Sequence, residues 1–278
     1  MNKWVLGARP RTLPAVIAPV IVAIAIAYPD FDLINALLAL IVGLALQIAV
    51  NYANDYSDGI KGTDEDRIGP VRLVASGLAS AAAVKNAAYF AFAIGAFAGL
   101  ALSLRTSYWL IAVGGAAIIS AWRYTGGENP YGYRGLGEVY VFIFFGLVAT
   151  LGTFYGQTGE ITIEALMAAI SNGAVSCALL AVNNIRDIDG DTKVGKQTLA
   201  VKLGDTRARR FFMFLIFVAI VAGFTISILA ALAVIPAIKL LNEIKFKRGK
   251  ELIAVLGATG QFQLILGALI SIGTLVNY

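Results

Sequence analysis

Long apolar stretches, separated by short polar segments, make up most of the chain. A helix of about 17–25 apolar residues is long enough to cross the hydrocarbon core of a bilayer. Stretches of this kind can be delimited at 12–28, 33–53, 84–103, 107–122, 139–156, 165–182, 211–238 and 252–276. The pattern predicts an all-α, multi-pass transmembrane helical bundle that forms a single integral-membrane domain over residues 1–278.

The first apolar stretch is expected to be a retained helix. Pro14 and Pro19 interrupt it, and no cleavage site of small residues stands out beside it. A secretory signal sequence has an uninterrupted apolar segment followed by such a site. We therefore interpret residues 12–28 as a membrane helix.

Positive charge is concentrated in alternate connecting segments. If the N-terminus is cytoplasmic, 21 of the 22 Lys and Arg residues fall in inside loops, and Arg105 is the exception. Lys and Arg residues that flank membrane spans remain on the cytoplasmic side. The distribution therefore predicts a cytoplasmic N-terminus, and it places 13 of the 17 acidic residues on the same side.

One segment complicates the number of spans. Loops 183–210 and 239–251 are both basic and should share a side, yet only residues 211–238 separate them. Two full spans need about 40 residues. We expect two short or kinked helices with a turn at Gly223 or at Thr225–Ser227, which gives nine helices. The alternative is a single span, with eight helices and a basic outer loop.

The composition limits the available chemistry. Hydrophobic residues make up 59% of the chain and charged residues 14%, whereas a soluble domain has about 25% charged residues. The chain has no His and one Cys, Cys177. These absences exclude His-based acid–base catalysis, Ser-His triads and Cys-rich metal sites. Carboxylates, amides, hydroxyls, Lys and Arg must therefore carry any chemistry.

Two apolar stretches end in similar polar clusters. In each, amides and carboxylates recur at helical spacing, so that members of the cluster line one helix face. The first cluster contains Asn51, Asn54, Asp55 and Asp58, and the second contains Asn183, Asn184, Asp187 and Asp191. Oxygen ligands without His or Cys suit Mg²⁺. The candidate metal ligands are Asp55, Asp58, Asp187 and Asp191.

Cations follow each acidic cluster. Lys61, Arg67 and Arg72 come after the first, and Lys193 and Lys196 after the second. Acids beside bases indicate a site for a metal-bound diphosphate, although Asn, Asp and Gly also end helices in ordinary solvated loops. The matched spacing of the two clusters favours the site. The weaker candidates, which lie beyond the helix ends, are Asp64, Glu65, Asp66 and Asp189.

A third polar loop, 122–138, falls on the same predicted side. Its glycines allow the backbone to approach a ligand closely. Candidate binding residues in it are Arg123, Tyr124, Tyr131, Tyr133, Arg134 and Glu138. The alternative is that the aromatic residues belong to the interfacial belt of a membrane protein. Arg and Glu residues are harder to explain in that way.

These motifs resemble those of the UbiA superfamily of intramembrane prenyltransferases. The resemblance rests on Asn54-Asp55-Tyr-Ser-Asp58, on the loop that ends at Glu138, and on Asn183-Asn184-Ile-Arg-Asp187 followed by Gly195-Lys196-Gln-Thr-Leu. Within the superfamily they resemble most the branch that prenylates 1,4-dihydroxy-2-naphthoate in menaquinone synthesis. The resemblance covers nearly the whole chain.

The resemblance implies nine helices around a central cavity capped by cytoplasmic loops, in a prokaryotic plasma membrane. It implies transfer of a polyprenyl chain from its diphosphate to dihydroxynaphthoate, with Mg²⁺ as cofactor and the bilayer as the surroundings; no nucleic acid is expected as a partner. The implied catalytic residues are Asn54, Asp55, Asp58, Asn184, Asp187 and Asp191. The implied substrate-binding residues are Asn51, Lys61, Arg67, Arg72, Arg123, Tyr124, Tyr131, Tyr133, Arg134, Glu138, Asn183, Lys193 and Lys196.

Two departures from the superfamily pattern stand out. Gly62 occupies a position at which many members have Asp, and Asp64 is the candidate replacement. The segment 211–238 is short for the seventh and eighth helices.

Several roles stay open at this point. Either Arg134 or Arg123 could pair with the carboxylate of the acceptor. Phe142, Phe144, Phe145 and Phe154 either line an isoprenoid groove or pack helices together. Alternative functions are prenylation of another acceptor, such as hydroxybenzoate, homogentisate, a haem or a lipid phosphate, and cation-coupled transport.

Overall fold

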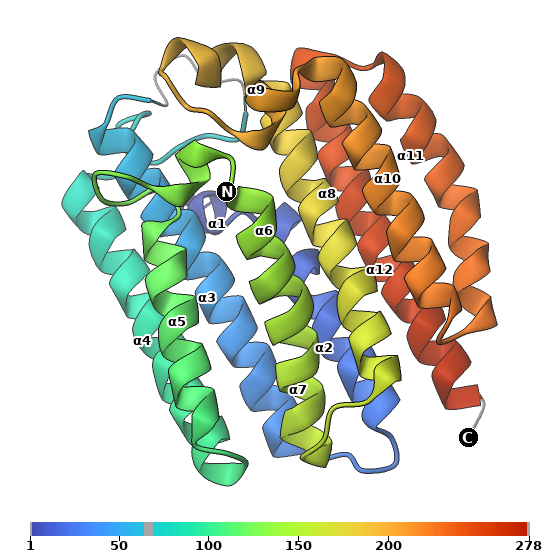
Figure 1. Cartoon of the computed structure of the whole chain (residues 1–278). Helices are drawn as coiled ribbons and strands as arrows, with labels where there is room; N and C mark the ends of the chain where they lie inside the picture. Colours follow the sequence, from blue (N-terminus) through green and yellow to red (C-terminus); the bar gives the residue numbers. More distant parts are fainter. Residues whose placement is uncertain (1, 64–68, 277–278) are drawn as a thin grey trace.

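The computed structural model describes residues 2–63 and 69–276, and within these ranges every regular element is helical (Figure 1). The main helices are α1 (Lys3–Ala8), α2 (Pro14–Ala27), α3 (Leu33–Ile60), α4 (Ala81–Arg105), α5 (Trp109–Arg123), α6 (Gly137–Val141), α7 (Ala149–Thr158), α8 (Ile163–Lys193), α9 (Leu199–Leu203), α10 (Asp205–Phe224), α11 (Val234–Phe246) and α12 (Leu252–Val276). Short connecting helices are η1 (Pro10–Thr12), η2 (Tyr131–Arg134), η4 (Ile228–Ala233) and η5 (Gly249–Glu251), and η3 (Phe142–Val148) is a π-helical stretch that joins α6 to α7. The predicted all-α class is confirmed.

Four acidic or basic candidates from the sequence, Asp64, Glu65, Asp66 and Arg67, lie outside the described residues. Gly62 is described and has a φ of 69°. This left-handed conformation favours glycine, which gives a backbone reason for the absence of an acid at that position.

Two of the helices are longer than their apolar stretches. α3 begins after Asp32, whose side chain accepts a hydrogen bond from the Asn35 amide at 2.8 Å, and it continues to Ile60. α8 begins after Thr162, which caps it in the same way, and it continues to Lys193. Both polar clusters are therefore on helices and not on loops.

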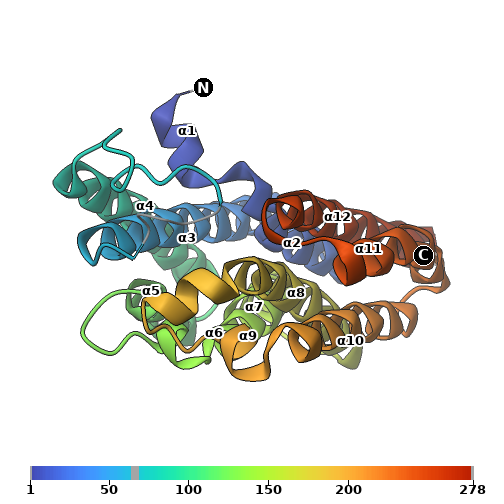
Figure 2. The same cartoon turned by 90° about the horizontal axis from the view of Figure 1, so that it is seen from above.

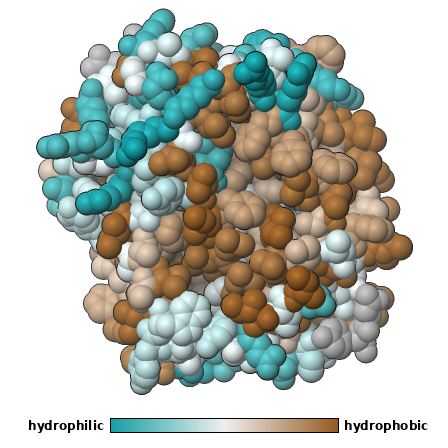
Figure 3. Space-filling model, viewed as in Figure 1, coloured by the Kyte–Doolittle hydropathy of each residue, from teal (hydrophilic) through white to brown (hydrophobic). Residues whose placement is uncertain are grey.

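The surface has the character of a membrane protein. By length and composition, α3, α4, the continuous helix Gly137–Thr158, α8 and Gly249–Val276 could each cross a bilayer, and the bent pair Lys3–Thr12 and Pro14–Ala27 could form a sixth span. Large side chains such as Phe90 and Phe97 are exposed, at 71% and 75%. Figure 3 shows a hydrophobic belt across the middle of the molecule, with hydrophilic residues gathered at the end near α9. The multi-pass prediction is confirmed.

The segment 211–238 is broken where the charge pattern requires it. α10 ends at Phe224, and the Ser227 side chain caps the next helix. The Arg209 side chain donates hydrogen bonds to the carbonyls of Ile244 and Lys247, which joins the far ends of α10 and α11. The two basic loops therefore lie at the same end of the bundle. Nine crossings stay a prediction.

Viewed from above, the helices form two rows (Figure 2). One row runs α4, α3, α2, α12, and the other contains the Gly137–Thr158 helix, α8 and α10. α5 packs on α3 and α4 at the end of the rows. The middle of the second row is tight: a Cβ on Gly146 would lie 2.6 Å from the Cα of Gly173. The rows diverge between α3 and α8, where a cavity opens.

The end of the bundle opposite the two polar clusters is held by Arg105, the one cation that the charge pattern separates from the other cations. Its Nε donates to Asn35 Oδ1 at 2.7 Å, and its NH2 lies 2.9 Å from Asp32 Oδ2. The backbone amide of Asp32 in turn donates to Gln157 Oε1 at 2.7 Å. The Asn35 amide and Arg105 both hold the pKa of Asp32 below its ordinary value. This network joins α3, α4 and α7.

Cysteine accessibility tests the arrangement of the ends. Cys177 is buried, so Cys177→Ala gives a cysteine-free background. We expect Lys193→Cys and Lys245→Cys, both exposed, to react with a membrane-impermeant maleimide from the cytoplasmic side, and Glu160→Cys to react only from the other side. Labelling of Lys245→Cys from outside alone would contradict the α10–α11 hairpin.

Candidate functional site

A cavity of about 350 Å³ lies between α3 and α8 at the charged end of the bundle. Its polar lining includes Asn51, Asn54 and Asp58 from α3, and Asn183, Asn184, Asp187 and Asp191 from α8. The structure therefore brings together seven of the eight amide and acid residues that the sequence proposed. Deeper in the cavity the lining becomes apolar.

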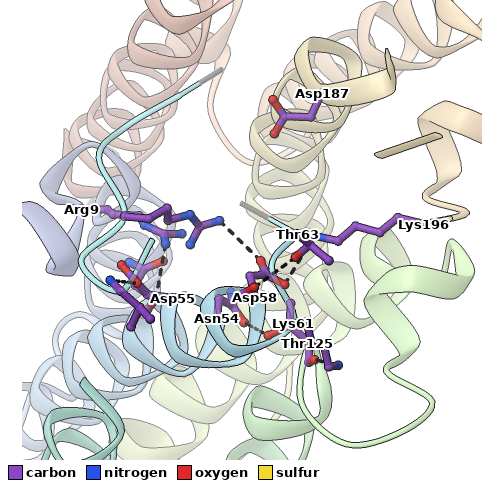
Figure 4. A network of polar contacts seen from close by, with 12 residues as sticks. Arg9, Asn54, Asp55, Asp58, Lys61, Thr63, Thr125, Asp187 and Lys196 are labelled. Atoms are coloured by element: carbon purple, nitrogen blue, oxygen red, sulfur yellow. Dashed lines mark hydrogen bonds and ion pairs between the residues drawn. The ribbon is translucent and has the colours of Figure 1, made fainter. Parts of the chain in front are cut away.

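Asp58 is the centre of the polar end. It is 3% exposed, and its Oδ1 accepts a hydrogen bond from the Tyr133 hydroxyl at 2.6 Å. The same oxygen accepts one from Lys196 Nζ at 3.4 Å (Figure 4). On the other side, Oδ2 lies 3.7 Å from Arg72 NH2. Three separate segments of the chain therefore converge on one carboxylate of α3.

The Tyr133 ring lies between two ammonium groups. Lys61 Nζ is 4.9 Å from its centroid and Lys196 Nζ is 4.6 Å from it. Lys61 also donates to the carbonyl of Thr125 at 2.7 Å. Burial, together with the nearby charge of Lys196, lowers the pKa of Lys61, while Asp58 opposes this shift. These contacts hold the 124–136 loop as a cap over the end of α3.

The two amides of α3 have different partners. Asn54 Oδ1 accepts a hydrogen bond from Thr125 Oγ1 at 2.9 Å, and so fixes the cap. Asn51 Nδ2 donates to the Ala8 carbonyl at 2.9 Å and to Thr12 Oγ1 at 3.1 Å, and so holds the bend that follows α1. Both side chains line the cavity.

The prediction for Asp55 needs correction. Its side chain is fully buried and is not part of the cavity lining. Its oxygens accept hydrogen bonds from the backbone amides of Leu73, at 2.8 Å, and Val74, at 3.0 Å. Asp55 therefore positions the segment that carries Arg72, and its geometry does not support the predicted role as a metal ligand.

On α8, Asp187 faces the cavity from across the site (Figure 4). Both of its oxygens are 2.7 Å from the guanidinium of Arg186, a residue that sequence reasoning did not single out. The backbone carbonyl of Asp191 accepts a hydrogen bond from the Lys196 amide at 2.8 Å. That bond shapes the turn after α8, from which the Lys196 side chain reaches back to Asp58.

The side-chain oxygens at the polar end suit a hard cation that takes its other ligands from a bound molecule. Among the described residues, no group of three or more acidic, His or Cys side chains is close enough to hold a metal by itself. Asn54 and Asp58 on one wall and Asp187 and Asp191 on the other offer only oxygen. Mg²⁺ typically takes one or two carboxylates, with the rest of its ligands from phosphate and water. The separation of the two sets fits ions that are completed by a diphosphate.

The third loop contributes its tyrosines. Tyr124, Tyr131 and Tyr133 line the cavity, so an interfacial belt alone does not explain them. Burial raises the pKa of the Tyr124 hydroxyl well above its ordinary value, and the charge of Glu138 adds to the shift, so the hydroxyl stays protonated. Glu138 is buried behind the cavity wall, where its Oε1 accepts a hydrogen bond from Asn184 Nδ2 at 2.9 Å. It acts on the site through Asn184.

Several predicted residues do not reach the cavity. Arg123, Arg134, Asp189 and Lys193 are exposed and are not part of its lining. Arg123 and Arg134 belong to the loop 122–138, and Asp189 and Lys193 belong to the end of α8. All four side chains are exposed, so water can solvate their charges. Neither Arg123 nor Arg134 is therefore placed to bind an acceptor carboxylate inside the cavity.

The phenylalanines of 142–154 divide into two groups. Phe144 and Phe145 line the cavity, while Phe142 packs on Gly173 and Phe154 is buried in the helix core. The first two come from η3, a π-helical turn. Two of the four candidates therefore line the apolar part of the cavity.

Sequence reasoning missed several polar residues of the lining, among them Arg9, Thr12 and Gln47. A signal was present for Gln47, since it precedes Asn51 by four residues and extends the polar stripe of α3 by one turn. No comparable signal marked Arg9 and Thr12, because their place depends on the bend of 53° between Lys3–Thr12 and α2.

Comparison with known proteins gives concordant matches. Residues 16–272 match the UbiA prenyltransferase family. The 1,4-dihydroxy-2-naphthoate octaprenyltransferase of Mycobacterium tuberculosis is 48% identical over 272 residues, which cover 95% of this chain and 93% of that protein. The enzyme of the same name from Escherichia coli K12 is 40% identical over 217 residues, with 75% and 70% covered.

A solved structure gives the fold independently. A UbiA homologue from Archaeoglobus fulgidus, bound to DMAPP and Mg²⁺, aligns over 100% of both chains with a TM-score of 0.71 at 13% identity. At this identity the match shows that the two proteins share a fold.

Ligand-induced stabilisation separates the roles of Asp55 and Asp58. We expect Mg²⁺ with inorganic diphosphate to raise the melting temperature of the purified protein and of Asp55→Asn by about 5 °C at a hundredfold excess over the dissociation constant. Asp58→Asn should gain little, because it loses a carboxylate that faces the ligand. The shift is measured by differential scanning fluorimetry in detergent, each variant against itself without ligand. Loss of the shift in Asp55→Asn alone would restore Asp55 as a ligand.

Proposed function

The chain belongs to the UbiA prenyltransferase family, and we propose that it transfers a polyprenyl chain from its diphosphate to 1,4-dihydroxy-2-naphthoate. The observation that carries the proposal is the cavity itself. Side chains with oxygen ligands line both walls of its polar end, two buried cations lie beside Asp58, and apolar residues line the rest of the cavity. A molecule with a charged head and a hydrocarbon tail fits such a space.

Mg²⁺ is the proposed cofactor, held by Asn54 and Asp58 on one wall and by Asp187 and Asp191 on the other. When bound, the metal neutralises charge on the diphosphate and makes it a better leaving group. Asn51, Asn183 and Asn184 offer further polar groups along the same walls. Asp55 supports the site from behind.

The cations at Asp58 would assist the departure of the diphosphate. As the allylic carbon–oxygen bond breaks, its electron pair goes to the diphosphate oxygen, and negative charge grows there. Arg72 and Lys196 already lie 3.7 Å and 3.4 Å from the Asp58 carboxylate. Preorganised positive charge of this kind stabilises the transition state without reorganisation. Lys61, next to Tyr133, adds to the same field.

The surroundings would protect the allylic cation. Phe144 and Phe145 line the cavity, and the 124–136 loop covers its polar end. Exclusion of water prevents simple hydrolysis of a reactive intermediate. No side-chain nucleophile is required, because the electron-rich ring of the acceptor attacks the allylic carbon.

The acceptor part of the reaction follows from its chemistry. The ring forms a carbon–carbon bond at the carbon that bears the carboxylate, and loss of that group as carbon dioxide returns an electron pair to the ring. The product of this step is the hydroquinone form of demethylmenaquinone, because no electrons have been removed from the ring. Such a lipid remains in the bilayer, which suits a prokaryotic plasma membrane with the N-terminus and the Asp-rich helix ends on the cytoplasmic side.

Prenyl transfer by the purified protein tests the proposal. We expect Mg²⁺-dependent formation of the hydroquinone form of demethylmenaquinone from octaprenyl diphosphate and dihydroxynaphthoate. Oxidation by air converts it to the quinone, which is then measured by chromatography. Asp58→Asn and Asp187→Asn should lower kcat/KM by about 10²–10³-fold, since each removes a carboxylate that would hold Mg²⁺ on the diphosphate.

Asp189→Asn is the matched control for this test. Asp189 lies on the same helix as Asp187, but it is exposed and outside the cavity lining, and its replacement should leave activity within about twofold. A panel with hydroxybenzoate and homogentisate covers the other acceptors. Preference for one of these would overturn the naphthoate assignment, and full activity of Asp187→Asn would overturn the metal–diphosphate site.

A further inference from the structure

The side-chain amide of Asn184 is bound to the protein at only one of its two ends. Its Nδ2 donates a hydrogen bond to Glu138 Oε1 at 2.9 Å, behind the cavity wall. Its Oδ1 has no hydrogen-bond partner among the described residues, and it is not one of the atoms sealed in the interior. Asn184 lines the cavity. The amide oxygen is therefore available to a ligand in the cavity.

Asn184 also extends the row of acids on α8. Asn184, Asp187 and Asp191 follow one another at i, i+3 and i+7, which places them on one helix face, and all three line the cavity. On the opposite wall, the oxygen of Asn54 already accepts a hydrogen bond from Thr125 Oγ1 at 2.9 Å. The α8 wall thus offers an amide oxygen next to its two carboxylates.

Glu138, which holds this amide, is an expensive residue in its place. It is 5% exposed, and its Oε2 has no hydrogen-bond partner among the described residues. The side chain that donates to it, Asn184, is neutral. A buried carboxylate without a cation beside it costs free energy. Glutamine has nearly the same shape and no charge, so packing alone does not explain the glutamate.

A carboxylate differs from a glutamine amide because it only accepts hydrogen bonds. Glu138 therefore attracts the Nδ2 end of Asn184 and repels the Oδ1 end, which selects one of the two orientations of the amide. Glu138 is itself fixed. It lies in the first turn of the helix Gly137–Thr158, where the helix dipole favours negative charge, and its carbonyl accepts a hydrogen bond from Cys177 Sγ at 3.1 Å.

The selected orientation presents an acceptor to the cavity and keeps the donor behind the wall. Diphosphate oxygens are themselves acceptors, so an amide that served them would have to present its Nδ2. A divalent cation and the water molecules around it bind to acceptor oxygens. The orientation of Asn184 consequently suits the metal ion and not the anion.

We propose that Glu138 is a positioning residue that turns the Asn184 amide oxygen toward the metal side of the site, where this oxygen binds Mg²⁺ or a water molecule of its shell. The inference rests on the proposed function and concerns the metal site of the same cavity. It adds no step to the reaction.

Mg²⁺ titration of the purified protein in detergent tests the proposal without turnover. Inorganic diphosphate is held constant, and differential scanning fluorimetry gives the Mg²⁺ concentration at half of the maximal rise in melting temperature. We expect Glu138→Gln to raise this concentration about tenfold, because glutamine accepts either orientation of Asn184. A merely structural Glu138 would change the melting temperature without ligands and leave this concentration unaltered.

An exchange of the two groups provides the rescue. In Glu138→Gln with Asn184→Asp, the glutamine Nε2 can donate to one oxygen of the new carboxylate while the other oxygen faces the cavity. We expect the double variant to return to within about threefold of the unsubstituted protein, because an aspartate presents oxygen in either orientation. A double variant as weak as Glu138→Gln would overturn the proposal.

Cys177→Ala is the matched control. It removes the other side-chain contact between α8 and Glu138, the hydrogen bond from Cys177 Sγ to the Glu138 carbonyl, and leaves the carboxylate in place. Its Mg²⁺ concentration at half-maximal shift should equal that of the unsubstituted protein. An increase as large as that of Glu138→Gln would mean that any loosening of α6 from α8 weakens the metal site, and the proposal would fail.

The outcomes separate this inference from the proposed function. If the unsubstituted protein shows no Mg²⁺-dependent shift with diphosphate, the metal–diphosphate site fails and this inference fails with it. If the shift is present and Glu138→Gln leaves the titration unchanged, only the role of Glu138 is overturned. Should Glu138→Gln fold poorly, Asn184→Leu removes the oxygen directly. It is expected to raise the Mg²⁺ concentration about tenfold, and an unchanged titration would overturn the proposal.

Discussion

The buried carboxylate of Asp58 is the contact on which the arrangement of the polar end depends. A charge in a water-poor site is tolerated only when it is paired and hydrogen-bonded. Asp58 meets this condition with Tyr133, Lys196 and Arg72, which come from three different segments. One residue of α3 therefore fixes the cap, the turn after α8 and the segment before α4. The cavity below exists because these segments close over it.

The same pairing explains how the site can hold ligands of opposite sign. Without ligands, the acids and cations at the polar end neutralise one another, as Asp187 and Arg186 also do. A diphosphate brings negative charge for the cations, and a divalent ion brings positive charge for the acids. When ligands bind, contacts between protein side chains are replaced by contacts between those side chains and the ligands, and the buried charges stay compensated. The separated carboxylates are thus consistent with a metal site that the substrate completes.

Sequence periodicity predicted the helices, the acidic helix ends and the broken segment 211–238, because each rests on local composition. It could not decide which carboxylate of α3 faces inward. At about 100° per residue, Asp55 lies about 70° from the midline of the stripe that includes Asn51 and Asp58. A residue at that angle can face either toward the cavity or away from it. The backbone amides of Leu73 and Val74, which hold Asp55, come from a segment that no helical pattern places.

The N-terminal wall of the cavity could not be predicted in full from the sequence, for a related reason. Gln47 extends the polar stripe of α3 by one turn, but Arg9 and Thr12 lie in a short segment that no periodic pattern connects to it. Only the bend between α1 and α2 brings the three together, and the Asn51 side chain stabilises that bend through Ala8 and Thr12. The amide of Asn51 therefore belongs to both halves of the cavity. The stripe that holds Asn54 and Asp58 continues through Asn51 to Gln47, so one face of α3 lines both the polar end and the N-terminal wall of the cavity.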